Sequence, residues 1–487
     1  MAGHSHFSPA NVEEHFEFSS EGKKRIIYGF IAGIVALIIG IYLLSKGESG
    51  GHEIAAAGHE AANAGHEVAA AGHEAANAGH EVAAAGHEAA NAGHEVAAAG
   101  HEAVGHLSGG AASHQPAAGE HYDWTNRIWA NVWLNAVFFT GISVIGMFFV
   151  SLQYLAKAGW SSVLKRVPEA FPKFLYVTLP ILLAVFFFKG DVIFHWMHHG
   201  VTEVGSENYD KIIAGKSGYL NKTFFIARLI GFGAIWLILW NMLRKKSLEE
   251  DLVGGTEIFT KLVRIGVAFI VIFGLSSSMF AWDWVMSIDT HWFSTMFGWY
   301  MFSSWHVTGL AIITLTVLLL KDKGYMSYVN ENHLHDMGKF MFAFSIFWSY
   351  VWFSQFLLIY YANFPEETIY FLERWEGHNK IYKTSEILNI LFNFLFPFLV
   401  LMTRDAKRTR IFLKIACFFI ISGHYIDFYQ MIMPGVVGPH GGYGLVEFGM
   451  LTAFSCAFIY VISDELTKAS LVAKNHPFLL EALHHDI

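Results

Sequence analysis

Residues 280–299 read FAWDWVMSIDTHWFSTMFGW and join two long apolar runs, at 262–285 and 292–320. A helix that crosses a bilayer needs about 20 predominantly apolar residues. Runs of this kind recur along most of the 487 residues, of which 54% are hydrophobic and only 15% are charged. Because the runs are too long for barrel strands and lack their strict alternation, the sequence predicts an all-α polytopic membrane protein.

Ten apolar runs are present, and we expect each of them to form one membrane-spanning helix. Their expected bounds are 26–44, 128–156, 172–190, 222–243, 262–285, 292–320, 338–362, 384–402, 411–431 and 444–463. The predicted organisation is an N-terminal leader (1–25), a first membrane helix (26–44), a loop with a heptad repeat and linker (45–126), a nine-helix membrane domain (127–465) and a C-terminal tail (466–487).

Basic residues predict how the chain is oriented in the membrane. One side of the predicted topology carries 22 of the 32 Lys and Arg residues. Loops on the cytoplasmic side of a membrane carry an excess of these residues. We therefore expect both termini in the cytoplasm, and we expect the loop 286–291 on the outer, periplasmic side.

The long loop after the first helix contains a repeat in which GHE recurs every seven residues from Gly51 to Gly100. A glycine in each heptad costs a helix roughly 1 kcal/mol. Successive histidines would lie about 10 Å apart on a helix, at ~1.5 Å per residue. This spacing is too long to share one metal ion and favours a solvated tether, with a metal-binding or pH-sensing element as the alternative.

Ionisable residues are expected to gather in the outer half of the membrane. Asp283, for example, lies about 28 Å beyond Arg264 along the same helix, at ~1.5 Å per residue. Because this helix enters from the inner side near Arg264, Asp283 is expected near the outer face. Such groups are costly inside a bilayer and are candidates for function. The inner half is expected to hold few comparable groups apart from its basic flanks. The outer candidates are Asp191, His195, Arg228, Asp283, His291, His424 and Asp427.

Each of these residues also has a structural interpretation. Asp283 and Asp427 can simply reach water at the interface, and Arg228 can form an ion pair with Asp191 or Asp283. His424 lies one turn before Asp427, so the carboxylate can orient the imidazole, or the two can pass a proton.

Nearer the midplane, hydroxyl groups and one histidine leave two interpretations open. Small polar residues such as Ser276 and Ser277 usually hold membrane helices together, and a buried histidine such as His306 is usually a packing residue. The alternative is a hydrated proton path that leads from these residues to the outer vestibule.

Three classes of membrane function agree with these patterns. The first is a proton-conducting or quinol-handling component of a respiratory complex. The second is a secondary transporter, whose site would lie at the midplane on broken helices, such as those with Pro180 and Pro397. The third is a haem-b protein, for which His195 and His424 are the conceivable ligand pair.

Other classes lack support in the sequence. The formal net charge of −9 argues against nucleic acid as a partner. Cys417 and Cys456 both lie inside apolar runs and form no pattern for a metal site. We therefore expect no metal site and no catalytic residue of the hydrolase type.

Four stretches resemble the quinone-binding subunit 2 family of alternative complex III, the bacterial quinol:cytochrome c oxidoreductase. The resemblance covers about residues 120–465 and excludes the heptad repeat. It implies a fold like that of the NrfD and polysulfide-reductase membrane subunits, with helices 2–5 and 6–9 as two four-helix bundles and helices 1 and 10 on their flanks. The stretches are KSGYLNKTFFIAR (216–228), DWVMSIDTHWFSTMFG (283–298), FWSYVWFSQFLLIYYANFPEE (347–367) and GHYIDFYQMIMP (423–434).

The resemblance also implies a place in a complex in the bacterial cytoplasmic (inner) membrane. Its partners would be a second, homologous membrane subunit, an iron–sulfur subunit, multihaem cytochromes c and a terminal oxidase. We expect no covalently bound cofactor, a structural and proton-conducting role, and menaquinone or another quinone as the candidate ligand. Asp283, His424 and Asp427 would form the outer part of the proton path.

Overall fold

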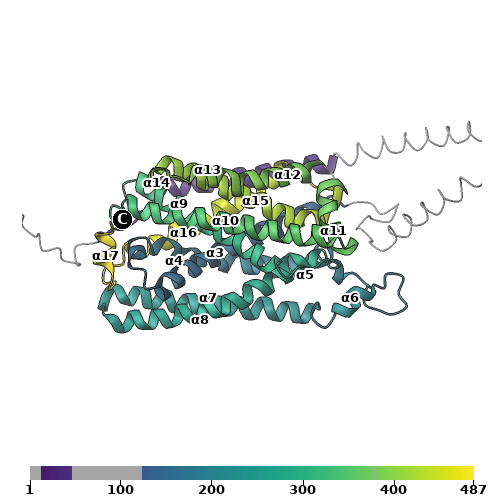
Figure 1. The fold of residues 1–487 in the computed structure, drawn as a ribbon, viewed down its shortest axis with the longest axis horizontal. Coiled ribbons are helices and arrows are strands. Elements are labelled where there is room, and N and C mark those ends of the chain that lie inside the picture. Colours follow the sequence, from purple (N-terminus) through teal and green to yellow (C-terminus); the bar gives the residue numbers. More distant parts are fainter. Residues whose placement is uncertain (1–12, 47–122, 378–379, 487) are drawn as a thin grey trace, which may run out of the picture. The chain divides into compact units, whose positions relative to one another are not determined.

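The structure is a computed structural model that describes residues 13–46, 123–377 and 380–486 (Figure 1). Within these residues the chain is helical and forms no β-strand, and ten helices are long and apolar enough to cross a membrane. The prediction of an all-α polytopic membrane protein with ten spans is confirmed. The heptad repeat lies outside the described residues.

The first membrane span is the helix Ser20–Lys46. The others are α3 (Thr125–Leu155), α4–η4–α5 (Arg166–Ala170, Phe171–Phe174 and Leu175–Ile193), α7 (Lys222–Val253), α8 (Thr256–Trp284), α9 (Phe297–Asp322), α10 (Glu331–Ala362), α12–η8–α13 (Lys380–Ile390, Leu391–Leu395 and Phe396–Val400), α15 (Arg410–Val437) and α16 (Leu445–Leu466). The short elements are η3 (Gly159–Val163), η5 (His195–Met197), α6 (Lys211–Lys216), η6 (Met286–Ile288), α11 (Pro365–Leu372), η7 (Glu373–Gly377), α14 (Arg404–Arg408), η9 (Gly438–His440) and α17 (Leu479–Leu483).

Several helices extend beyond their predicted bounds, among them α7 and α15 at their C-terminal ends. The fourth span was expected to stop at residue 243, yet α7 continues to Val253 because Arg244, Ser247 and Glu250 are buried inside the protein. The ninth span was expected to stop at residue 431, yet α15 continues to Val437. Hydropathy marks the apolar part of α7 and misses its last turns, whose polar side chains find partners within the fold, whereas the added residues of α15 (IMPGVV, 432–437) are apolar.

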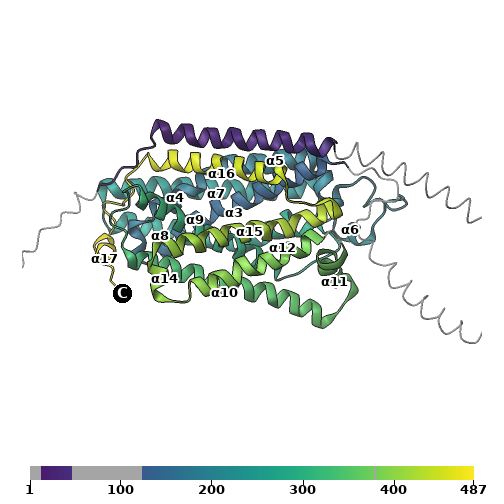
Figure 2. The same ribbon diagram turned by 90° about the horizontal axis from the view of Figure 1, so that it is seen from above.

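The contacts divide the chain into two units, residues 1–37 with 125–487, and residues 38–124. In the first unit, α3 is buried along nearly its whole length and packs against α5, α8, α9, α15 and α16. Figure 2 shows α3 among these helices. Helices α5 and α8 each pack on α3 and on α7, and α9 packs on α10 and α15 while α12 packs on α15. Helix α3 also packs closely on α9 and α15. The division into two separate bundles stays a prediction.

Small residues allow the central helices to approach closely. A Cβ atom on Gly141 of α3 would lie 1.9 Å from the Trp305 ring of α9. A Cβ atom on Gly423 of α15 would lie 2.3 Å from the Asn393 amide oxygen in η8. Asn393 stands four residues before Pro397, which cannot donate a backbone hydrogen bond, and η8 is a π-helical turn at this point. Such turns are frequent at functional sites.

The first unit has two distinct ends, which both views show (Figures 1 and 2). Elements α6 and α11 lie at one end, and α14 and α17 lie at the other. We call them the α6–α11 end and the α14–α17 end. The loop 286–291 lies at the α6–α11 end, because Lys216 of α6 donates to the Thr290 carbonyl oxygen at 2.5 Å.

Candidate functional site

The most completely buried carboxylate among the predicted candidates is Asp427 of α15, at 0% exposure. Its Oδ1 accepts hydrogen bonds from Asn389 Nδ2 at 2.9 Å and from the Tyr300 hydroxyl. Its Oδ2 accepts from Ser304 Oγ at 2.6 Å and from Trp348 Nε1 at 3.0 Å. The four donors come from α9, α10 and α12, and all four are neutral. Asp427 is therefore held by hydrogen bonds rather than by a Lys or Arg cation.

His424 lies one turn before Asp427 on α15 and is also fully buried. Its Nδ1 is 3.5 Å from Asp427 Oδ2, and its ring stands edge-on to Trp348. Among the described residues, no hydrogen-bond partner faces its Nε2. The structure thus brings the predicted His424–Asp427 pair together. Asp427 lies ten residues before the end of α15, about 15 Å into the helix at ~1.5 Å per residue, which is deeper than we expected.

A second buried acid, Glu386 of α12, lies on the α6–α11 side of Asp427. Its carboxylate accepts from Trp352 Nε1 at 2.9 Å and from Gln430 Nε2 at 3.0 Å. A cavity of about 20 Å³ is lined by Glu386, Gln430 and Tyr300. This volume is sufficient for one water molecule with polar partners. Tyr300 thus lies between the two acids, because its hydroxyl donates to Asp427 and the residue lines the same cavity as Glu386.

The loop between α8 and α9 forms the end of this polar cluster that lies toward the α6–α11 end. Arg374 of η7 also lines the cavity, and its Nε donates to the Gln430 carbonyl oxygen at 3.0 Å. Its Nη2 donates to Asp289 Oδ2 at 3.0 Å. Asp289 belongs to the loop between α8 and α9. We define the Asp427 cluster as Asp427, His424, Tyr300, Ser304, Trp348, Asn389, Glu386, Gln430, Arg374 and Asp289.

Sequence reasoning missed most members of the Asp427 cluster. Glu386, Asn389 and Asn393 are spaced three and four residues apart, so they share one face of α12 and η8. This spacing could have identified the three residues as a polar face on one membrane helix. Tyr300 and Trp348 carried no comparable signal, because aromatic residues are frequent along the entire chain.

Glu373, next to Arg374, gives this end of the protein a pH-dependent stability. Burial, and next the nearby Asp289 carboxylate, raise the pKa of the Glu373 side chain from 4.5 to about 7, although Arg374 opposes the shift. The folded state thus binds this proton more tightly than the unfolded state. The stability contribution is complete below pH 4.5 and is lost as the pH rises to about 7.

The pH dependence can be measured on the full-length protein. We expect the melting temperature to fall between pH 4.5 and 7 and expect Glu373→Gln to flatten this slope. Glu376→Gln is the control, because Glu376 is exposed on the same turn. An unchanged slope in Glu373→Gln would contradict the assignment.

Asp283 lies apart from the Asp427 cluster in a buried ion pair with Arg228. Arg228 Nε is 2.5 Å from Asp283 Oδ2, and Arg228 Nη2 is 3.0 Å from Oδ1. The guanidinium also lies over the Tyr219 and Phe224 rings, with its Cζ atom 4.0 and 4.1 Å from their centroids. Of the two partners proposed for Arg228, Asp283 is the one in contact. This geometry supports a structural role, and none of the described hydrogen bonds joins Asp283 to Asp427.

The remaining outer candidates lie at the surface of the α6–α11 end. Asp191 is exposed, and the structure does not bring it to Arg228. The His195 ring lies near His198 and His291, at 4.9 and 6.1 Å between centroids. His291 Nε2 is 2.5 Å from Asp210 Oδ2, and Asp210 caps the N-terminus of α6.

The midplane candidates are engaged in contacts between and within helices. Ser276 Oγ accepts from Trp236 Nε1 at 3.1 Å, which joins α7 to α8. Ser277 Oγ donates to the Gly274 carbonyl oxygen at 3.4 Å within α8. His306 is buried among the rings of Phe148, Phe302 and Phe344. These contacts favour the packing interpretation for Ser276 and His306.

The expectation of few buried charges at the other end was wrong. Glu169 is buried with Arg166 at 3.0 Å and with Arg244 at 3.5 Å, and Arg244 is also 3.3 Å from Glu465. Hydropathy places such residues in flanking loops, but here α4 continues through η4 into α5 as one span, and its Arg166 and Glu169 are buried inside the protein. What we call the α4 network consists of Glu169, Arg166, Arg244, Glu465, Lys165, Ser247, Glu250 and Asp251.

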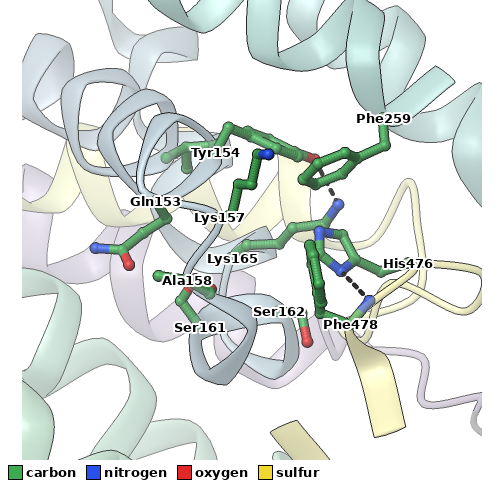
Figure 3. Close-up of a pocket in the computed structure, with 11 residues that line it drawn as sticks. Gln153, Tyr154, Lys157, Ala158, Ser161, Ser162, Lys165, Phe259, His476 and Phe478 are labelled. Carbon is green, nitrogen blue, oxygen red and sulfur yellow. Dashed lines mark hydrogen bonds between the residues drawn. The ribbon is translucent and has the colours of Figure 1, made fainter. Parts of the chain in front are cut away.

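Lys165 joins the α4 network to a small pocket that the C-terminal tail closes (Figure 3). Its Nζ donates to Tyr154 at 2.7 Å and to Glu250 at 2.6 Å. His476 and Phe478 of the tail line the same pocket. Burial lowers the pKa of His476 to about 2, so this imidazole is neutral at physiological pH. The pocket is therefore a packed anchor for the tail.

Within the described residues, no three His, Cys, Asp or Glu side chains gather in a way that could hold a metal ion.

Comparisons with known proteins assign the chain to no protein family. No protein-family model matches the sequence, and no curated protein matches it either.

Proposed function

We propose that this protein is an integral membrane component of a respiratory quinol:cytochrome c oxidoreductase of the alternative complex III type. The four family-like stretches and the ten-helix architecture support this proposal. In it, the protein lies in the bacterial inner membrane with both termini in the cytoplasm. Its partners are the homologous membrane subunit, the iron–sulfur subunit, the multihaem cytochromes c and a terminal oxidase.

Within that complex, we propose that the protein conducts protons through the Asp427 cluster. The observation that carries this role is a fully buried carboxylate held only by neutral donors and a histidine. Asp427 can exchange a proton without breaking an ion pair, whereas Asp283 would have to abandon Arg228. Tyr300, the small cavity and Glu386 continue the polar connection toward Asp289 and the outer loop.

The two other functional classes receive less support. A transporter needs room for a substrate at its polar site, and the cavity beside Glu386 holds only about 20 Å³, while the larger cleft between α9, α15 and α16 is lined mainly by apolar side chains. A haem-b site needs two facing histidines at one depth. His195 lies in η5 at the α6–α11 end, whereas His424 lies 13 residues, or about 20 Å at ~1.5 Å per residue, before the end of α15.

The test is the variant Asp427→Asn in the intact complex, with turnover and proton release measured together. The amide keeps the size of the side chain but cannot ionise. We expect quinol:cytochrome c turnover to fall by about tenfold or more, in line with the loss of a proton-transfer group, while the complex remains assembled. Asp191→Asn, which changes an exposed carboxylate, is the control. Wild-type turnover and proton yield in Asp427→Asn would reject the proton-conducting role.

A further inference from the structure

Three buried polar atoms belong to residues that line the small cavity beside Glu386. They are Gln355 Oε1 of α10, Gln430 Oε1 of α15 and Trp375 Nε1 of η7. None of these atoms has a hydrogen-bond partner among the described residues. A buried donor or acceptor without a partner destabilises a fold. Three of them around one cavity indicate that a bound molecule satisfies them together.

The size of the cavity limits what that molecule can be. The volume is about 20 Å³. An organic ligand would need a pocket of roughly 300 Å³ or more. A water molecule needs only about 10–15 Å³ and two to four polar partners, and the cavity meets both conditions.

The charges in the lining also favour a neutral molecule. Glu386 brings a carboxylate and Arg374 brings a guanidinium to the same cavity, so an ion of either sign would meet a like charge. The guanidinium already donates to the backbone oxygens of Gln430 and Tyr370 and to the Asp289 carboxylate. Water fits the volume, the charges and the mixture of donor and acceptor atoms.

Stacked aromatic rings give the cavity a fixed shape. The Trp375 ring stacks on Phe356 with 6.4 Å between centroids, and Phe356 stacks on Trp352 at 5.9 Å. The Tyr370 ring stacks on Trp292 at 3.9 Å. Trp352, Tyr370 and Trp375 all line the cavity. Closely packed rings of this kind resist rotation, so the cavity does not collapse onto its polar atoms.

We propose that the cavity binds one ordered water molecule, that Gln355 is its positioning residue, and that the water joins Tyr300 to Glu386. The water accepts from Trp375 Nε1 and donates to Gln355 Oε1 and to Gln430 Oε1. One lone pair is left for a fourth partner, and Tyr300, which lines the same cavity, supplies it.

The use of this water in proton transfer rests on the proposed function. Asp427 gives a proton to Tyr300, Tyr300 gives its hydroxyl proton to the water, and the water gives one of its own protons to Glu386. The hydrogen that reaches Glu386 turns away from Gln430, whose Nε2 lies 3.0 Å from that carboxylate. The net change moves one proton from Asp427 to Glu386. None of the described hydrogen bonds joins Tyr300 to Glu386, so the water completes the path.

Binding is tested by electron cryo-microscopy of the intact complex, at a resolution that shows ordered water. We expect a density peak within about 3 Å of Gln355 Oε1, Gln430 Oε1 and Trp375 Nε1. Gln355→Leu should remove the peak, because leucine has a similar size but no acceptor. Gln355→Glu keeps an oxygen at this position and should keep the peak. An empty cavity in the unmodified complex would overturn the proposal.

Thermal unfolding of the full-length protein provides an independent test. If water satisfies Gln355 Oε1, Gln355→Leu removes a hydrogen bond and should lower the melting temperature. If this oxygen has no partner, the same substitution removes an unsatisfied buried carbonyl and raises the melting temperature, which would contradict the proposal. Ser354→Ala is the matched control and should leave the melting temperature unchanged, because Ser354 is the neighbour of Gln355 on α10 but does not line the cavity.

Turnover of the intact complex tests the role in proton transfer. Gln355→Leu should lower quinol:cytochrome c turnover by about fivefold, the effect of losing one hydrogen bond to the water. It should also increase the solvent deuterium isotope effect, and Gln355→Glu should restore both values. Slower turnover with an unchanged isotope effect would reject the positioning role. If Asp427→Asn lowers turnover and Gln355→Leu does not, this inference fails while the proposed function stands.

Discussion

Asp283→Ala is expected to lower the free energy of unfolding by about 3–5 kcal/mol, the usual cost of removing one partner of a buried ion pair. Arg228 makes two short hydrogen bonds to this carboxylate, and both side chains are almost completely buried. The variant leaves a guanidinium between two aromatic rings with only the Tyr219 carbonyl oxygen as a described acceptor.

Thermal unfolding and resistance to trypsin of the full-length protein in detergent would measure this effect. Asp191→Ala is the matched control, since it removes an exposed carboxylate at the same end of the protein and should change neither readout. The double variant Arg228→Met, Asp283→Leu should recover much of the lost stability, because it removes both buried charges together. If Asp283→Ala is as stable as Asp191→Ala, the ion pair does not hold α7 to α8.

The ten spans could be predicted because each apolar run is long enough to cross a bilayer by itself. The relative depth of Arg228 and Asp283 also followed from helix geometry, since both stand near helix ends at the same side. The choice between Asp191 and Asp283 as the partner did not follow, because it depends on which helices are neighbours. The sequence of one chain does not show which helices are neighbours.

The same limit explains the Asp427 cluster. Its donors are contributed by α9, α10 and α12, and only the packing of these helices around α15 brings Tyr300, Trp348 and Asn389 to one carboxylate. The positions of His424 and Asp427, one turn apart, could be predicted because they depend on one helix alone. Local spacing was informative, whereas contacts between distant segments were not.

The α4 network leads to the second expected result, a large destabilisation by Glu169→Ala. Glu169 is 1% exposed, and its carboxylate faces Arg166, Arg244 and Ser247. Without it, two buried guanidiniums share the remaining acids of the network. We expect a loss of about 3–5 kcal/mol in the free energy of unfolding, because uncompensated charge is left in a buried site.

Glu249→Ala provides the comparison that makes this result specific. Glu249 forms an ion pair with Lys246 on the surface of the same end of the protein, at 2.5 Å. Exposed ion pairs contribute little to stability, so this variant should have the same melting temperature as the unmodified protein. Glu169→Gln should lie between the two, since an amide keeps hydrogen-bond acceptance but loses the charge. Equal melting of Glu169→Ala and Glu249→Ala would show that Asp251 and Glu465 are sufficient for Arg166 and Arg244, and that Glu169 contributes only volume.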